Sequence, residues 1–176
     1  MVRFAHGPLM EQTGESGLAA LPTSPASIWW DGKEPSLEAL NAPHREGLSG
    51  LMGIEFIELG ADWIKARMPV DERTWQPFKR LHGGASVALA ETVGTVGAIA
   101  TLDPTQLVAV GMEINANHVR PAYSGWVYAT ARPEAIGRST QVWSIRIEDE
   151  QGKLVCVSRF TVAVIPIRRQ GPGAKP

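Results

Sequence analysis

The most informative segment of this sequence is HGGASVALAETVGTVGAIATL, residues 82–102. Its small and apolar residues continue for a length typical of a helix rather than a strand. A helix with so little polar surface needs neighbours on nearly every side. Glu91 is the only charged residue in this segment. The segment therefore predicts a long helix, buried on nearly every side, at the centre of the domain.

Shorter segments on both sides of this helix have the length and composition of strands. Before it, residues 54–59 and 63–70 are separated by Gly60 and Asp62, which predicts a hairpin. After it, four strand-length segments follow, with a turn at Gln151 and Gly152: residues 106–121, 125–137, 139–150 and 153–166. The pattern predicts an α+β domain in which an antiparallel sheet of five or six strands wraps a central helix.

The two ends of the chain differ from this core. Residues 1–27 carry scattered Gly, Pro, Ser and Thr without a period, so we expect a flexible N-terminal extension. Residues 167–176 are basic and rich in Gly and Pro, so we expect a flexible C-terminal tail. A single domain is then expected over residues 28–166, where Ser36 is placed to cap a short helix.

Composition excludes several classes of function. The 17 basic and 18 acidic residues give a net charge of −1, so no electrostatic footprint for nucleic acid is present. Cys156 is the only cysteine, which excludes an intramolecular disulfide and fits a reducing compartment. The chain has neither a signal-peptide pattern nor an uninterrupted apolar run long enough for a membrane span. We expect a cytoplasmic protein without a membrane partner.

Glu91 and the HisGlyGly motif carry the clearest chemical signal. A carboxylate in an apolar helix must reach solvent, find a partner or serve a functional site. The glycines at 83 and 84 allow a ligand to approach backbone N–H groups at the positive end of the helix dipole. Alone, the motif is more typical of a plain helix entry. Together, the two features favour a site for acyl transfer.

The spacing of these residues supports this interpretation. Eight residues separate Gly83 from Glu91, a rise of about 12 Å along a helix. Because side chains lean toward the helix N-terminus, the carboxylate and an oxyanion donor can flank one carbonyl carbon. Thr95 lies one turn beyond Glu91, where it would hydrogen-bond the carboxylate or a water, or bond the helix backbone instead. The four histidines lack metal-ligand spacing, so neither a metal nor a cofactor is expected.

At the level of whole segments, the sequence resembles a known enzyme family. QPFKRLHGGASVALAETVGTVGA, GMEINANHVRP and SRFTVAVI are similar to hotdog thioesterases of the 4-hydroxybenzoyl-CoA thioesterase type, in the branch with the phenylacetate-pathway enzymes. The resemblance is closest to the proofreading thioesterases of enterobactin biosynthesis and covers about residues 28–166. It implies a hotdog fold, active sites at a dimer interface and dimers that pair into tetramers.

The resemblance also assigns roles to residues. It places the catalytic acid on Glu91 and the oxyanion-binding amide on Gly83. His82, Gln76, Thr95 and His118 fall on other positions of the family's catalytic site, where the closest subgroup often has serine for Thr95 and a second histidine for Val119. The expected contacts to substrate are Gly84, Val96, Arg120 and, more weakly, Arg138.

Three hypotheses about function remain open from the sequence. The first is hydrolysis of an aryl or medium-chain acyl thioester, carried on coenzyme A or on a carrier protein, with Glu91 as nucleophile or general base. The second is a hotdog hydratase or dehydratase, which would remove a proton beside the carbonyl. The third is a non-catalytic acyl-CoA-binding subunit.

Overall fold

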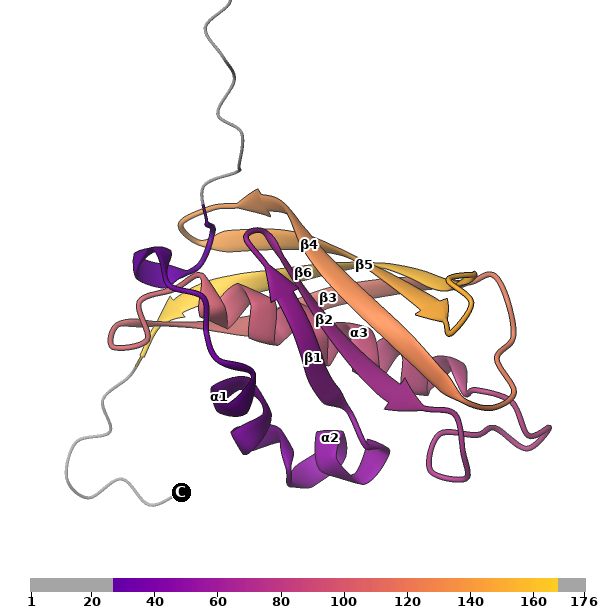
Figure 1. The fold of residues 1–176 in the computed structure, drawn as a ribbon. Coiled ribbons are helices and arrows are strands. Elements are labelled where there is room, and N and C mark those ends of the chain that lie inside the picture. Colours follow the sequence, from indigo (N-terminus) through magenta and orange to yellow (C-terminus); the bar gives the residue numbers. More distant parts are fainter. Residues whose placement is uncertain (1–26, 168–176) are drawn as a thin grey trace, which may run out of the picture.

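The computed structural model describes residues 27–167, and they form a six-stranded antiparallel sheet with a long helix across one face (Figure 1). The strands are β1 (Glu55–Gly60), β2 (Trp63–Pro69), β3 (Leu107–His118), β4 (Trp126–Ile136), β5 (Thr140–Asp149) and β6 (Leu154–Pro166). The helices are η1 (Trp30–Gly32), α1 (Leu37–Asn41), η2 (Ala42–His44), α2 (Gly47–Met52) and α3 (Gly83–Ala100). The predicted fold class is confirmed.

The predicted cap at Ser36 is confirmed. Ser36 accepts a hydrogen bond from the Ala39 amide at 3.2 Å and so caps α1. The chain enters the domain where Ile28 donates to the Ala61 carbonyl at 3.0 Å, and Ile167 is still bonded to the Gln106 carbonyl at 2.8 Å. The predicted extension and tail otherwise lie outside the described residues.

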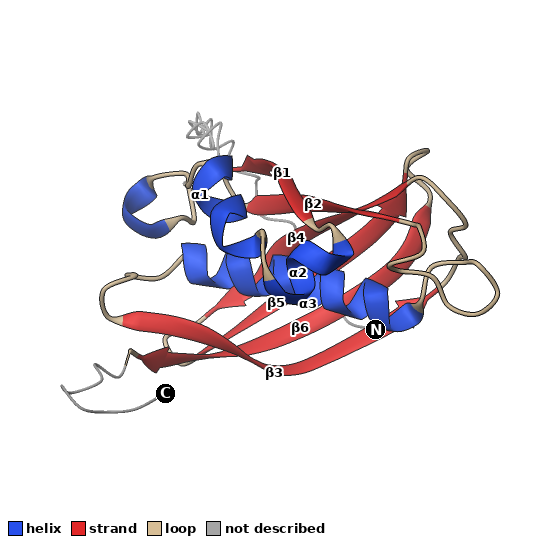
Figure 2. Ribbon diagram, turned by 90° about the horizontal axis from the view of Figure 1, so that it is seen from below, coloured by secondary structure: helices blue, strands red, loops and turns tan. Residues whose placement is uncertain are grey.

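The order of strands in the sheet is β1-β2-β4-β5-β6-β3. Strands β4, β5 and β6 form a meander, whereas β3 follows α3 and pairs only with β6, so it lies at a free edge of the sheet (Figure 2). The other edge, β1, is protected: the Asn41 side chain both donates to and accepts from the backbone of Phe56, each at 2.8 Å. Unpaired backbone groups are therefore concentrated along β3.

Helix α3 packs against strands β2 to β6, as the core helix of a globular domain does. By length and composition α3 could also cross a membrane, and within the described part of the chain it is the only helix of that kind. Leu89 and Val93 of α3 are fully buried, and Gly94 and Gly97 allow the helix to approach the sheet closely. A Cβ atom at Gly94 would lie 2.6 Å from the Phe160 ring.

Replacing Gly94 with Ala is expected to destabilise the domain. Overpacking a filled core costs about 1–3 kcal/mol, whereas Ala gains about 1 kcal/mol over Gly in a helix interior. Because Phe160 is only 1% exposed and cannot turn into solvent, the overpacking cost should exceed the helical gain. Thermal unfolding should show a lower Tm for Gly94→Ala, and the double variant with Phe160→Leu should recover part of the loss. An unchanged Tm would contradict this packing.

One expectation about α3 was wrong. The helix is not buried on nearly every side, because Gly83, Val87, Glu91 and Thr95 follow one another at intervals of four, and each is at least partly exposed. Residues spaced in this way form one ridge along a helix. Both α2 and β3 contact α3 (Figure 2). One face of α3 is therefore open in the protomer, and it carries Glu91, the only carboxylate of this helix.

Candidate active site

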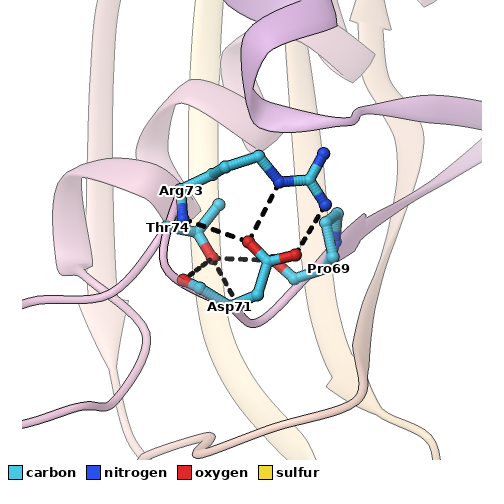
Figure 3. A network of polar contacts seen from close by, with 4 residues as sticks. All are labelled: Pro69, Asp71, Arg73 and Thr74. Carbon is cyan, nitrogen blue, oxygen red and sulfur yellow. Dashed lines mark hydrogen bonds and ion pairs between the residues drawn. The ribbon is translucent and has the colours of Figure 1, made fainter.

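A polar network holds the loop that leads from β2 to α3 (Figure 3). The buried Thr74 hydroxyl donates to the Pro69 carbonyl at 2.7 Å and accepts from the Asp71 amide at 3.2 Å. The Asp71 carboxylate accepts two hydrogen bonds from the Arg73 guanidinium, at 3.0 and 2.6 Å. The side-chain hydrogen bond from Arg73 lowers the pKa of Asp71. The network fixes the start of the loop.

The tip of this loop orients Gln76. Its amide donates to the Arg80 carbonyl at 2.8 Å, and Lys79, with a φ of 59°, donates to the Gln76 carbonyl at 2.9 Å. The side-chain oxygen of Gln76 accepts from the Phe78 amide. Because that oxygen is occupied, the side-chain NH₂ group of Gln76 is left to donate to a ligand.

His82 is the N-cap of α3. Its amide donates to the Thr74 carbonyl at 2.8 Å, and its Nδ1 accepts from the Gly84 amide at 2.8 Å. An Nδ1 that accepts carries no proton, so neutral His82 holds its proton on Nε2. This bond also occupies the Gly84 amide, which we had expected at the substrate. The Gly83 amide, first in the helix, has no acceptor in residues 27–167.

His118 closes over Gly83 from the end of β3. A Cβ atom at position 83 would lie 3.0 Å from His118 Nε2, so glycine is needed for the imidazole to approach the start of α3. Both residues line a cavity of about 390 Å³ together with Gln76 and Arg120. The structure thus brings together four residues that the sequence had placed at the site.

Two further polar residues line this cavity and were not predicted. Arg80 lies in the loop before His82, and Ser86 lies one turn into α3. The signal for Ser86 was a hydroxyl three residues after Gly83, and the signal for Arg80 was a cation two residues before the HisGlyGly motif. Both signals are common in unrelated sequences.

Glu91 opens into a different cleft. That cleft measures about 160 Å³ and is lined by residues 111–114 of β3 and by Phe160 of β6. A Cβ atom at Gly111 would lie 3.1 Å from Glu91 Oε1, and the β3–β6 register shifts by one residue between Gly111 and Glu113. Such bulges often lie beside active sites. The predicted arrangement, in which Gly83 and Glu91 flank one carbonyl, is not present within a single protomer.

The next turn of α3 provides two different surfaces. The Thr92 hydroxyl donates to the Ala88 carbonyl at 2.7 Å, whereas the Thr95 hydroxyl has no partner among the described residues. Val96 lines an apolar cavity of about 350 Å³ between α3 and the segment that contains Leu40 and Pro43. Thr95 therefore belongs to the Glu91 ridge, and Val96 to the apolar cavity.

Arg138 is not brought to either cleft. It lies exposed in the turn between β4 and β5, at the opposite end of the sheet from His118. As for metals, residues 27–167 contain no group of three or more His, Cys, Asp or Glu side chains that could hold an ion.

Comparisons with known proteins identify relatives of this chain. The thioesterase superfamily model matches residues 78–156, which include the loop tip, α3 and β3 to the start of β6. The 1,4-dihydroxy-2-naphthoyl-CoA hydrolase of Escherichia coli is 49% identical over 130 residues, which are 74% of this chain and 95% of that protein. The chain belongs to the thioesterase superfamily. It is therefore an enzyme of the thioester hydrolase class.

Other members of the superfamily extend the comparison. The proofreading thioesterase EntH of Cronobacter turicensis is 48% identical over 130 residues, covering 74% of this chain and 94% of that one. A crystal structure of a variant of the thioesterase PA1618 from Pseudomonas aeruginosa superposes with a TM-score of 0.78 at 45% identity, covering 80% of this chain and all of that one. The expected hotdog fold is thereby confirmed.

Proposed function

We propose that this enzyme hydrolyses acyl-CoA or acyl-carrier-protein thioesters in a site shared by two subunits, with Glu91 as the catalytic carboxylate. The observation that carries the proposal is that the catalytic carboxylate and the oxyanion donor are separated within one protomer. The carboxylate and the free Gly83 amide lie on one ridge of α3 but open into different clefts of the same protomer. A second copy of the chain can bring its Glu91 to the Gly83 amide of the first.

The ridge itself suggests how the copies pair. Gly83 and Glu91 are each four residues from Val87, about 6 Å along the helix axis. If two α3 helices pack antiparallel about a two-fold axis near Val87, Gly83 of one subunit faces Glu91 of its partner. The same axis would align the free edges of the two β3 strands, where Val110 and Met112 are 40% and 64% exposed. Each dimer would then contain two complete sites.

The cavity residues, together with His82 at the N-cap of α3, would act on the thioester carbonyl. The Gly83 N–H, at the positive end of the α3 dipole, donates to the carbonyl oxygen, and the Gln76 NH₂ and His82 Nε2–H groups orient the thioester. Glu91 of the partner subunit then either attacks the carbonyl carbon, or takes a proton from a water that attacks it. In both routes the C–S bond breaks and the thiolate leaves. Thr95 is placed to hold the water or the carboxylate.

The apolar cavity beside Val96 is the proposed acyl site. Its volume of about 350 Å³ is more than twice that of an apolar cavity of about 150 Å³ that holds benzene, so an aryl or medium-chain acyl group fits. Val96→Phe should therefore reduce kcat/KM for bulky acyl groups more than for acetyl thioesters. The check is a comparison of Val96→Phe with the unaltered enzyme across a chain-length series, and equal losses for all acyl groups would contradict the assignment.

The rest of the substrate would lie near the cavity mouth. Arg80 and Arg120 line the 390 Å³ cavity that contains Gly83, and their guanidinium groups can bind phosphates. In the proposed dimer, Arg138 of the partner subunit lies at the same end of the assembly as the cavity and remains a weaker candidate. We also propose that two dimers associate into a tetramer and that the enzyme acts in the cytoplasm.

The deciding experiment is release of free thiol from a panel of acyl-CoA thioesters, aryl through long-chain, and from the same acyl groups on a carrier protein. Rapid release from one class supports the proposal and identifies the substrate. Binding without thiol release favours a non-catalytic subunit, and proton exchange beside the carbonyl without release favours a hydratase. Relatives named as hydrolases and thioesterases favour the first outcome.

A further inference from the structure

Ser86 differs from every other buried polar side chain in residues 27–167. Four such side chains are at most 2% exposed. Thr74 donates to a backbone carbonyl at 2.7 Å, Gln141 bonds two side chains at 2.9 Å, and Ser158 contacts a cysteine sulfur at 3.8 Å. Ser86 is only 1% exposed, and its hydroxyl has no hydrogen-bond partner in this part of the chain. The hydroxyl oxygen is nevertheless not fully buried, because Trp75 Nε1 is the one fully buried side-chain polar atom without a partner among residues 27–167. A hydroxyl that reaches a cavity without a protein partner is free to donate to a ligand.

The usual explanation for a serine in a helix does not apply. A helical hydroxyl can donate to the carbonyl one turn earlier, as Thr92 does to Ala88 at 2.7 Å. The equivalent acceptor for Ser86 is the His82 carbonyl, which receives only the Ser86 and Ala85 amides. Because Ser86 lines the 390 Å³ cavity, the little surface that it exposes faces that cavity.

The position of Ser86 places its hydroxyl close to the Gly83 amide. The two residues are three apart on α3, about 4.5 Å along the axis, and helical side chains lean toward the N-terminus. The free Gly83 N–H and the free Ser86 O–H therefore converge on one end of the cavity, which His118 closes from β3. Two unpaired donors at one end of a cavity fit a single oxygen acceptor.

We propose that Ser86 is a catalytic residue that donates a second hydrogen bond, beside the Gly83 amide, to the thioester carbonyl oxygen. The proposal rests on the thioesterase function proposed above and adds a residue to it. As the carbonyl carbon becomes tetrahedral, its oxygen gains negative charge, and both donors stabilise that charge. A hydroxyl can also rotate to follow the oxygen as the geometry changes. The Ser86 hydroxyl thus matters most in the transition state.

The test compares Ser86→Ala with Ser158→Ala on the thioester that the unaltered enzyme hydrolyses fastest. Loss of one oxyanion donor lowers kcat by about 10²-fold, so Ser86→Ala should lose about that much with little change in KM. Ser158 is the matched control, because it is a serine of the same 1% exposure on the inner face of β6, away from the cavity. Its replacement should leave kcat unchanged. Equal losses in both variants would overturn the proposal, as would a Ser86→Ala enzyme within about twofold of normal.

A spectroscopic measurement separates the catalytic role from a structural one. A thioester labelled with ¹³C at the carbonyl, bound to Glu91→Gln so that it persists, should show a lowered carbonyl stretching frequency. Adding Ser86→Ala should raise that frequency, and an unshifted band overturns the role of Ser86. If the unaltered enzyme releases no thiol from any thioester, the proposed function fails instead, so the two failures are distinct.

Discussion

Glu91→Gln should lower kcat for thioester hydrolysis by about 10³-fold or more, because the amide can neither attack the carbonyl nor accept a proton from water. Glutamine has almost the same shape as glutamate, and position 91 is exposed in the protomer, so the fold should be unaffected. Binding of the CoA thioester should survive, since Gly83, Gln76 and His118 lie in the other cleft. The measurement is steady-state thiol release together with equilibrium binding of a thioester.

The control for this change is Glu58→Gln, which removes an exposed carboxylate on β1 that pairs with Lys65 at 3.2 Å. Exposed ion pairs of this kind contribute little, so activity should be normal. Near-normal turnover of Glu91→Gln would remove Glu91 from the chemistry. A sharper form of the test mixes Glu91→Gln with Gln76→Ala, each inactive alone. In a shared-site dimer, a mixed pair has one intact site, so refolded equal mixtures should regain about a quarter of normal activity.

Val87→Arg should prevent dimer formation and abolish activity with it. If the two-fold axis passes near Val87, this residue meets its own copy, and the variant places two like charges against each other. Such a juxtaposition costs several kcal/mol, which weakens the dimer by at least about 10²-fold. Val87 is only partly buried in the protomer, so the variant should still fold. Sedimentation and thiol release measure the two effects.

The matched partner for this change is Val87→Glu, which should also be monomeric and inactive alone. Mixing it with Val87→Arg places opposite charges at the axis, so heterodimers and activity should return. Recovery in the mixture would locate the axis at Val87. A Val87→Arg enzyme that remains dimeric and active would contradict the proposed pairing of the α3 helices.

Much of the fold was predictable because its strongest signals are local. The apolar run of residues 83–100 has the length of a helix, and the hairpin of β1 and β2 is marked by its turn. The Ser36 cap and the turn at Gly152, with a φ of 71°, depend on residues within one turn of themselves. Propensity, periodicity and turn chemistry act over these short distances, so they can be read without the tertiary structure.

Tertiary packing decided which face of α3 is left uncovered. The composition of α3 predicts burial on nearly every side, yet the ridge with Val87 and Glu91 is open because β3 pairs beyond β6 rather than covering it. Composition measures how apolar a helix is, but not which strands lie against each face. The free donor of Ser86 was hidden for the same reason, since only the fold shows which hydroxyls lack partners.

The amino-acid sequence by itself therefore determined the fold class and the superfamily, and it predicted that Glu91 and the HisGlyGly motif act together. Only the tertiary structure decided that Gly83, Gln76, His118 and Arg120 share one cavity while Glu91 opens into another. The physical reason is that helix spacing fixes the axial separation of Gly83 and Glu91, but the cleft that each group faces depends on strands distant in the chain. In the proposed dimer, each protomer would contribute its Gly83 cavity to one site and its Glu91 to the other.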